Sequence, residues 1–369
     1  MKKIIRVAAV PTSLDILLRG QLQFLNNYYE VVGVASPDED IHRKISEREG
    51  IRTIQLKIER KISLFKDLKS LINLFLIFRK EKPYIVHSLT PKAGLLSMIA
   101  ARAAKVPVRI HTFTGLIFPW KKGFMCKILK LMDRLTCIAA TSVIPEGEGV
   151  KRDLINSHIT NKLSGVLANG NINGVDLEYF RPTSKTSNST ITRFIFVGRI
   201  VRDKGIEELM EAFERLNNAE LILVGSFEQE LDPLSDNCLR WIKRGKNVTY
   251  VGFKEDIRPF LANADVFVFP SHREGFPNTP LQAGAMGLPT IATNICGCNE
   301  IITDKVTGLL VEPHNADQLF KAMKLLADNP ALRAEMGINA RIHIAEKFSH
   351  QNVWNALLQF YHDAVSQVS

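Results

Sequence analysis

The sequence contains no run of 18 apolar residues without a charged one, so it predicts no membrane-spanning helix. Cysteine is scarce as well: the five cysteines are scattered, and their odd number argues against a disulfide framework. Cys296 and Cys298 lie close together, but no second close pair completes a metal site, so an ordinary loop is the simpler interpretation. This cysteine usage favours a reducing, cytoplasmic setting.

Charge is distributed unevenly over the 369 residues. Residues 1–180 carry 28 Lys and Arg against 16 Asp and Glu, whereas residues 181–369 carry 20 against 22. The basic excess of the first half indicates an anionic partner, either a nucleic acid or a membrane surface. The sequence shows no helix-turn-helix, RNA-recognition or zinc-finger signature, so we expect no nucleic acid and favour an anionic membrane.

Short apolar runs alternate with longer helical patterns along the chain, which is typical of parallel sheets with helices on both faces. The expected strands span residues 4–10, 31–35, 53–56, 84–87, 108–112, 137–141, 165–168, 194–197, 221–224, 248–251, 266–269 and 290–292. The expected helices include residues 15–27, 64–79 and 92–104. The fold class is therefore α/β, with two Rossmann-like, doubly wound parallel sheets.

A polar, flexible stretch between Arg181 and Thr192 interrupts this pattern and is typical of a linker. We therefore expect a first domain over residues 1–180 and a second over residues 181–369. We also allow for the C-terminal helix packing back on the first domain. With two such domains facing each other, the cleft between them is the default ligand site.

The first motif that could carry chemistry follows the expected strand 194–197. Gly198 lets the backbone turn tightly, and Arg199 and Lys204 then lie at the carboxyl end of the strand, just before Gly205. Two fixed cations beside the start of a helix suit a diphosphate. The alternative is a tight turn with solvated basic residues.

The second motif follows the expected strand 266–269. Pro277 and Pro280 suit the first turn of a helix, so the amides near Asn278 and Thr279 are available to phosphate oxygens. Glu274 precedes this helix, where a carboxylate can accept hydrogen bonds from sugar hydroxyls. Gln282 lies within the helix and can reach the same ligand. The alternative is a structural loop with a helix cap.

Together these segments resemble the glycosyltransferases of family 4, which have the GT-B fold of two facing Rossmann-like domains. The resemblance covers essentially the whole chain. Besides the two motifs it includes Asn173-Gly-Val-Asp176, Arg181-Pro182 and the loop Asn294-Ile-Cys-Gly-Cys-Asn-Glu300.

The resemblance implies that the second domain binds a nucleotide-sugar donor. Arg199 and Lys204 would contact the diphosphate, and Glu274 would bind hydroxyls of the donor sugar. Gln282 stands where the family usually has a second glutamate for the ribose hydroxyls, but an amide can still accept one hydrogen bond and donate another. The remaining expected donor-binding residues are Gly198, Gly252, Phe253, Lys254, Gly275, Phe276, Pro277, Asn278 and Thr279.

The same resemblance implies that the first domain holds the acceptor. Many relatives have a histidine directly before Gly115, close to the reacting sugar, whereas this chain has Thr114 there and His111 three residues earlier. His111 is therefore a catalytic candidate, and a buried histidine at a strand end is the alternative. His87 and Lys92 would meet the acceptor, with a surface lysine as the alternative for Lys92.

Members of the family retain the anomeric configuration and need no metal ion, so we expect no cofactor. Asp38-Glu-Asp40 matches the Asp-x-Asp pattern of metal-dependent transferases. It precedes an expected helix, however, and acidic residues favour a helix N-terminus. No general base stands out from the sequence.

Two segments of the basic half combine apolar and basic residues. Residues 64–78 form an apolar helical pattern, for which a core helix with a solvated basic face is the favoured interpretation. Residues 118–130 place Trp120 beside Lys121 and Lys122, and there a membrane interface is favoured.

Our leading hypothesis is a retaining, metal-independent hexosyltransferase that uses a UDP-sugar, often a UDP-N-acetylhexosamine in such relatives. Its acceptor would be a polyprenyl-diphosphate-linked or other glycan of bacterial cell-surface polysaccharide synthesis, at the inner face of the cell membrane. The alternatives are a UDP-sugar 2-epimerase with the same fold, or a non-catalytic nucleotide-sugar-binding protein. The departures at Gln282 and Thr114 motivate the second alternative.

Overall fold

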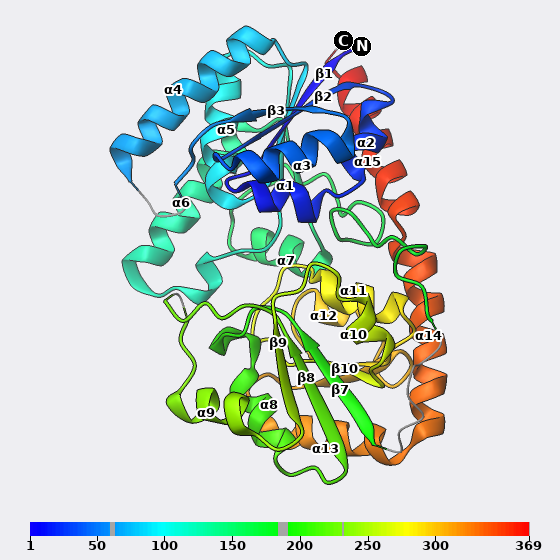
Figure 1. Cartoon of the computed structure of the whole chain (residues 1–369). Coiled ribbons are helices and arrows are strands. Elements are labelled where there is room, and N and C mark those ends of the chain that lie inside the picture. Colours follow the sequence, from blue (N-terminus) through cyan, green and yellow to red (C-terminus); the bar gives the residue numbers. More distant parts are fainter. Residues whose placement is uncertain (60–62, 184–190, 231, 369) are drawn as a thin grey trace. The chain divides into compact units, whose positions relative to one another are not determined.

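The computed structural model describes residues 1–59, 63–183, 191–230 and 232–368 (Figure 1). The central part of the expected linker, residues 184–190, lies outside these ranges. The chain forms two compact units, one of Met1–Asn173 with His350–Ser369 and one of Gly174–Ser349.

Each unit is built on a six-stranded parallel sheet, and this confirms the predicted α/β class. The first sheet has the order β3-β2-β1-β4-β5-β6, with strands at Lys3–Val7 (β1), Glu30–Ala35 (β2), Arg52–Gln55 (β3), Ile85–Ser88 (β4), Val108–Phe113 (β5) and Ser142–Pro145 (β6). The second has the order β12-β11-β10-β7-β8-β9, with strands at Thr192–Val197 (β7), Ala219–Val224 (β8), Val248–Gly252 (β9), Val266–Phe269 (β10), Thr290–Thr293 (β11) and Gly308–Val311 (β12). Both orders are doubly wound, so each sheet has one point where the strand order reverses.

Helices cover both faces of the first sheet. They are α1 (Pro11–Leu17), α2 (Gln21–Asn26), α3 (Glu39–Glu49), α4 (Leu64–Glu81), α5 (Pro91–Ala103), α6 (Gly123–Ala139), α7 (Glu148–Asn156) and α15 (His350–Ser366), with a short 3-10 helix η1 at Phe118–Trp120. α5 packs against β4 and β5 and also against α4 and α6. Leu14 of α1 and Leu22 of α2 are fully buried in one cluster with Leu357 of α15, so the C-terminal helix completes the first unit.

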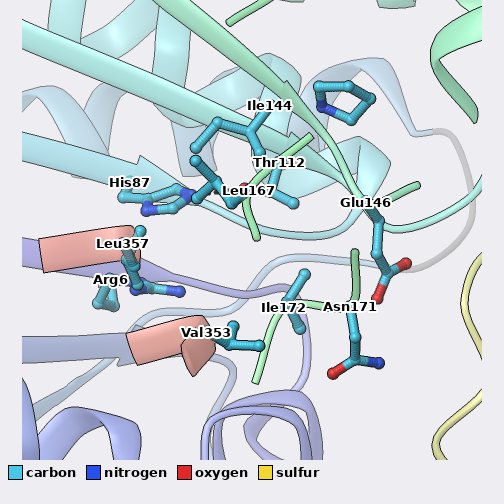
Figure 2. Close-up of a pocket in the computed structure, with 11 residues that line it drawn as sticks. Arg6, His87, Thr112, Ile144, Glu146, Leu167, Asn171, Ile172, Val353 and Leu357 are labelled. Atoms are coloured by element: carbon cyan, nitrogen blue, oxygen red, sulfur yellow. Dashed lines mark hydrogen bonds between the residues drawn. The ribbon is translucent and has the colours of Figure 1, made fainter. Parts of the chain in front are cut away.

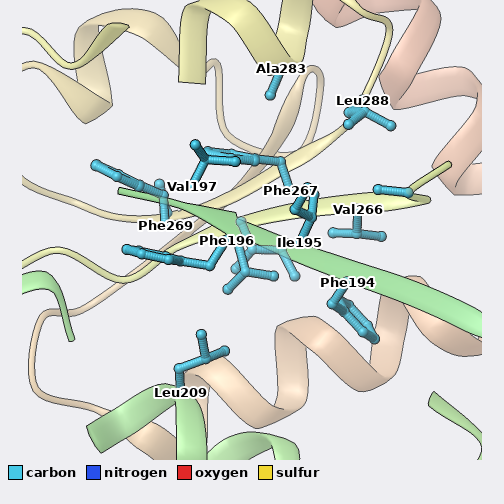
Figure 3. Packing of buried hydrophobic residues seen from close by; sticks show 14 of the residues in the cluster. Phe194, Ile195, Phe196, Val197, Leu209, Val266, Phe267, Phe269, Ala283 and Leu288 are labelled. Carbon is cyan, nitrogen blue, oxygen red and sulfur yellow. The ribbon is translucent and has the colours of Figure 1, made fainter. Parts of the chain in front are cut away.

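The second unit has the same plan. Its helices are α8 (Ile206–Phe213), α9 (Asp236–Arg244), α10 (Arg258–Ala262), α11 (Asn278–Ala285), α12 (Cys298–Ile301), α13 (Ala316–Asp328) and α14 (Pro330–Phe348), preceded by the 3-10 turn η2 at Arg202–Lys204. Neighbouring strands β7 and β10 carry Phe196 and Phe269, whose rings stack with centroids 6.0 Å apart (Figure 3). Burying one such ring contributes about 1.5–3 kcal/mol, so this core holds the strand ends rigidly.

Three expected elements are corrected by the structure. Residues 137–139 form the last turn of α6, and the strand follows at Ser142–Pro145, because a short apolar run does not by itself distinguish a strand from a buried helical turn. Residues 165–168 form no strand, and only Ala168 makes an isolated bridge there. The helix expected over 15–27 is interrupted at Gly20, which adopts a left-handed φ of 76° and directly precedes α2.

The second unit begins earlier than the expected boundary at residues 180 and 181. Val175 donates its backbone N–H to the carbonyl of Phe348 at 2.8 Å. Arg341 donates to the carbonyls of Leu177 (3.1 Å) and Phe180 (2.8 Å). These contacts with α14 hold residues 174–180 to the second unit. Throughout the described ranges, every helix falls short of the length and hydrophobicity that crossing a bilayer requires.

Candidate active site

The predicted donor-binding residues gather at the carboxyl edge of the second sheet. β7 and β10 are neighbours, and the strand order reverses between them. The loop after β7 carries Arg199 and Lys204, and the loop after β10 carries Glu274. Ligands of doubly wound sheets bind at this point, because the loops diverge there and leave a crevice.

Lys204 and Glu274 form an ion pair at this edge. Their side chains are only 14% and 11% exposed, so the pair is largely shielded from solvent. The Lys204 ammonium also lies over the ring of Phe269, 5.3 Å from its centroid. Two residues that the sequence assigned to separate motifs are therefore in direct contact.

Gly205 allows this approach. It adopts a φ of 70° at the start of α8, and a Cβ added there would lie 2.0 Å from the carbonyl oxygen of Pro270. Only glycine permits both the left-handed conformation and the close contact between the two loops. The Gly205 N–H donates to the carbonyl of Arg202 at 2.8 Å, which closes the turn that presents Lys204.

Arg199 supplies a second cation at the same edge. Its side chain is 46% exposed, and Nη1 lies 2.8 Å from Oε2 of Glu228, a residue of the loop after β8. The Gly198 N–H donates to the carbonyl of Val224 at 3.0 Å, so the turn is fixed on β8. An anionic ligand would compete with the Glu228 carboxylate for Arg199.

The loop after β10 is held from two sides. Arg273 pairs with Asp203, with Nε 2.7 Å from Oδ2, and this contact ties the loop to η2. On the other side Gly297 approaches so closely that a Cβ there would lie 2.2 Å from the carbonyl oxygen of Gly275. Glu300 accepts a hydrogen bond from the Gly297 N–H at 3.3 Å and thus caps its own short helix.

The remaining donor-side residues lie on α11 and after β9. Pro277 is the residue before α11, Asn278 and Thr279 form its first turn, and Gln282 follows one turn later. Phe276 is buried, with its ring 5.6 Å from that of Phe348, so it anchors the loop. Gly252 ends β9 with a φ of 73° and is followed by Phe253, 66% exposed, and by exposed Lys254.

In the first unit, His111 lies inside the core. Its side chain is 1% exposed, its ring packs edge-on to Phe113, and Nδ1 shares a 2.9 Å hydrogen bond with the Ser88 hydroxyl. Burial lowers the pKa of His111 to about 3, so the ring is neutral at physiological pH. A Cβ on Gly94 would lie 2.3 Å from this ring, which shows how closely α5 covers it. This is the buried histidine that the sequence left as the alternative.

His87 lines a pocket of the first unit together with Arg6, Thr112, Glu146 and Asn171 (Figure 2). Its ring is held at 2.7 Å from the Thr112 hydroxyl and at 2.6 Å from the hydroxyl of Tyr361. Burial, followed by the nearby Arg6 charge, holds the pKa of His87 well below its usual value. Arg6 and His87 lie at one end of the pocket, and Glu146 and Asn171 lie at the other (Figure 2).

The other acceptor-side residues lie outside this lining. Lys92, at the start of α5, is 2.6 Å from Asp67 of α4 and is only 11% exposed, so it is not a free surface lysine. Thr114 and Gly115 follow β5 at its carboxyl end, where Gly115 has a φ of 115°. Thr90, which directly precedes α5, adopts a φ of 65°, rare for a β-branched residue, and its hydroxyl accepts from the Ala9 N–H at 3.2 Å.

Asp38 has a structural contact of its own. Its carboxylate accepts a hydrogen bond from the Ile41 N–H at 3.1 Å and caps α3, whose first turn contains Glu39 and Asp40. The helix expected after the Asp-x-Asp pattern is therefore confirmed. A different group, Glu208 with His272 and His314, also escaped the sequence analysis, because its members come from three segments with no motif spacing between them.

Two family models match segments of this chain. Residues 181–343 match the family described as glycosyl transferases group 1, and residues 6–144 match the family described as glycosyl transferase 4-like. The capsular polysaccharide biosynthesis glycosyltransferase CapM of Staphylococcus aureus is 34% identical over 373 residues, which cover 98% of this chain and 97% of that protein.

A second relative is the UDP-Gal:alpha-D-GlcNAc-diphosphoundecaprenol alpha-1,3-galactosyltransferase of Escherichia coli. It is 32% identical over 83% of this chain and 82% of its own. Among solved structures, HepE of Anabaena in complex with UDP and glucose matches the fold with a TM-score of 0.82 at 17% identity, over 98% of this chain and 100% of that one. The chain therefore belongs to the glycosyltransferase 4-like family and is a hexosyltransferase with the GT-B fold.

Proposed function

We propose that this enzyme transfers a sugar, an N-acetylhexosamine or a related hexose, from a UDP-sugar to a polyprenyl-diphosphate-linked acceptor in cell-surface polysaccharide synthesis. The observation that carries the proposal is the shielded Lys204–Glu274 pair at the strand-order reversal of the second sheet, with Arg199 at the same edge. A cation for the diphosphate and a carboxylate for the sugar are what a nucleotide-sugar site needs.

The pair can hold a donor without being broken. An ammonium has three donor hydrogens, so Lys204 can contact Glu274 and a phosphate oxygen at once. Glu274 keeps a second carboxylate oxygen for sugar hydroxyls. Arg199 would exchange Glu228 for the diphosphate, which offers bidentate, doubly charged oxygens in place of one half-exposed carboxylate. These cations and the α11 N-terminus would neutralise the leaving diphosphate without a metal ion.

The proposed reaction proceeds with retention. The bond between sugar C1 and the diphosphate oxygen breaks, and the acceptor hydroxyl oxygen forms a bond to C1 on the same face. The hydroxyl proton passes to the departing diphosphate oxygen, so no separate base is required. The name of the E. coli relative gives an alpha linkage formed from UDP-Gal, whose galactose is itself alpha-linked, and this supports retention here.

The acceptor class follows from the same relatives. One is named for capsular polysaccharide biosynthesis, and the other acts on a sugar linked to diphosphoundecaprenol. An acceptor anchored in a membrane requires an enzyme that works at the membrane surface.

The first unit carries a surface that suits this location. α4 exposes Phe65, Leu68, Ile72 and Leu76, which recur at helical spacing on one face. The core helix expected over residues 64–78 is not borne out in this respect, because only Ser70, Leu74 and Phe78 of α4 are buried. This exposed apolar face supports the proposal that the enzyme binds peripherally to the inner face of the cell membrane through the first unit.

The test is transfer from radiolabelled UDP-sugars to a short-chain polyprenyl-diphosphate sugar, in the presence of EDTA, with the anomeric configuration of the product read by NMR. Lys204→Ala and Glu274→Ala should each lower kcat/KM by at least about 100-fold, because each removes charge stabilisation from the transition state. Lys243→Ala, an exposed lysine of α9 in the same unit, is the matched control and should change little.

Loss of the pair also leaves one partner unpaired, so thermal unfolding must be followed in parallel. If the pair were only structural, the double variant would recover both stability and activity. Full activity of either single variant would remove these residues from the site. Conversion of UDP-N-acetylglucosamine without acceptor would instead favour the 2-epimerase, and donor binding without turnover would favour a non-catalytic protein.

A further inference from the structure

A cluster of two histidines and a carboxylate lies beside the loop that carries Glu274 and has no role in the proposed transfer. Glu208 lies in α8, His272 follows β10, and His314 lies between β12 and α13. Their side chains are 18%, 9% and 65% exposed, so the group is buried on one side and open on the other.

The three side chains converge on one point. His272 Nε2 lies 3.1 Å from Oε1 of Glu208, and His314 Nδ1 lies 3.3 Å from the same oxygen. The two imidazole rings have centroids 3.7 Å apart and are tilted by 43°. All three ligand atoms lie within 4.8 Å of one another.

Protein partners satisfy this group incompletely. Among the described residues, His272 Nε2 and Glu208 Oε2 are buried atoms without a hydrogen bond, since the short contact between His272 and Glu208 lacks hydrogen-bond direction. Buried polar atoms almost always have a partner, so an orphaned imidazole nitrogen aimed at a carboxylate points to a missing ligand. The backbone of His272 is held in place, because its N–H donates to the carbonyl of Asp203 at 2.8 Å.

The cluster therefore offers two imidazole nitrogens and one carboxylate oxygen to a cation.

We infer that Glu208, His272 and His314 bind one transition-metal ion of the zinc class. Zinc takes imidazole nitrogen and carboxylate oxygen at about 2.0–2.2 Å, and tetrahedral ligands at that radius lie roughly 3.3 Å apart. The two histidine–carboxylate separations, 3.1 and 3.3 Å, are compatible with this spacing, and all three ligand atoms lie within 4.8 Å of one another. The exposed side at His314 leaves the fourth position to water. Imidazole ligands select Zn²⁺, Cu²⁺ or Ni²⁺ over Mg²⁺ and Ca²⁺.

Such an ion would join three segments that are distant in sequence, namely α8, the loop after β10 and the loop before α13. It would therefore stabilise the second unit and fix the loop two residues before Glu274. The residues proposed to bind the donor are not among the three ligands, so ion binding and metal-independent transfer are tested separately.

The test uses the full chain without a histidine tag, stripped of metal. Zn²⁺ is titrated in competition with a chromogenic chelator, and Co²⁺ is added separately to read the absorption bands of a tetrahedral site. We expect one ion per chain, no competition from Mg²⁺, and a raised unfolding temperature with Zn²⁺. His314→Ala should weaken binding by at least about tenfold and abolish the thermal shift, because even outer-shell changes cost that much.

His314 is the chosen variant because its side chain is 65% exposed, so its loss should leave the fold intact. Glu208→Gln, which keeps the shape and removes the charge, is the second variant and should weaken binding as well. His362→Ala, an exposed histidine of α15, is the matched control. Absence of stoichiometric binding, or equal affinity of the wild type, His314→Ala and Glu208→Gln, would overturn the inference.

Discussion

Asp133 shows how burial alone sets the protonation of a single residue. It lies in α6 with its side chain 8% exposed, and burial raises its pKa to about 7. The unfolded chain ionises this group near its usual pKa of 3.8. Between about pH 4 and pH 7 the folded state therefore holds a proton that the unfolded state has lost. The free energy of unfolding falls as pH rises through this window and stays reduced above it.

Asp133→Asn should remove that dependence. At pH 8 the variant should be more stable than the wild type, by roughly 4 kcal/mol at most, since one pKa unit corresponds to about 1.4 kcal/mol. At pH 4 the two proteins should differ little. Urea unfolding at both pH values measures the difference. Asp328→Asn, on the exposed end of α13, serves as the control, and an equal gain in that variant would refute the role of burial.

At the residue scale, the sequence predicted those residues of the candidate site that lie in a loop directly after a strand. Arg199, Lys204 and Glu274 were identified because a turn glycine or a polar loop comes straight after a buried strand, and the structure brings Lys204 and Glu274 together. His111 obeyed the same local pattern yet lies in the core, because its burial depends on how closely Gly94 of α5 approaches. No local sequence pattern indicates how closely Gly94 and His111, which belong to different elements, approach each other.

At the scale of elements, the reliance on local sequence patterns also explains which strands were predicted well. β7, β8 and β10 each contain a continuous apolar run, at residues 194–197, 221–224 and 266–269, as expected for strands buried on both faces, and the predicted strands lie within the observed ones. The residues from Cys137 to Ala139 are just as apolar, but they form the last turn of α6 because that helix extends to Ala139. β12 was missed, because Gly308–Val311 is a short run at the edge of the sheet.

α4 and α6 expose apolar and basic side chains, and binding of a membrane to this surface can be tested. Both pack on α5, and both expose large apolar side chains, including Phe65 of α4 and Phe124 of α6. Lys121 and Lys122 stand exposed at the start of α6. Each basic residue near an anionic membrane contributes about 1 kcal/mol, so Lys121→Glu/Lys122→Glu should weaken binding to vesicles of anionic phospholipid by tenfold or more.

Phe65→Ser should weaken binding to the same vesicles without a change in salt dependence, because it removes only apolar contact. Sedimentation with vesicles at low and high salt separates the two contributions. Lys321→Glu/Lys324→Glu on α13 is the matched charge reversal on the other unit. Unchanged binding in the α6 and α4 variants, or an equal loss in the α13 variant, would contradict the proposed membrane surface.

At the scale of the whole molecule, the chain passes from the first unit to the second and then returns. The two doubly wound sheets were predictable from alternating strands and helices. The packing of the C-terminal helix on the first unit could not be predicted from the sequence alone, because it depends on a buried polar network whose members are far apart in the chain. Tyr361 of α15 lies 2.9 Å from Arg6 Nη1 in β1 and 2.6 Å from His87 Nδ1 in β4.

This network connects α15 to β1 and β4, the two central strands of the first sheet. Arg6 is 1% exposed, and its Nη1 bonds to Gln21 as well as to Tyr361, at 3.0 and 2.9 Å. Burial raises the pKa of Tyr361 to about 12, so the hydroxyl keeps its proton. Tyr361→Phe should destabilise the first unit by about 2–3 kcal/mol, because a buried, charged guanidinium loses one of its acceptors.

Hydrogen exchange read by mass spectrometry tests this prediction unit by unit. Amides of β1 and β4 should exchange faster in Tyr361→Phe, whereas those of β7 and β8 should keep their protection, since they belong to the other unit. Tyr28→Phe is the control, because that ring is 47% exposed. Equal loss of protection in both units would mean that the two unfold together, and an unchanged first unit would mean that apolar packing of α15 suffices without the Arg6–Tyr361–His87 network.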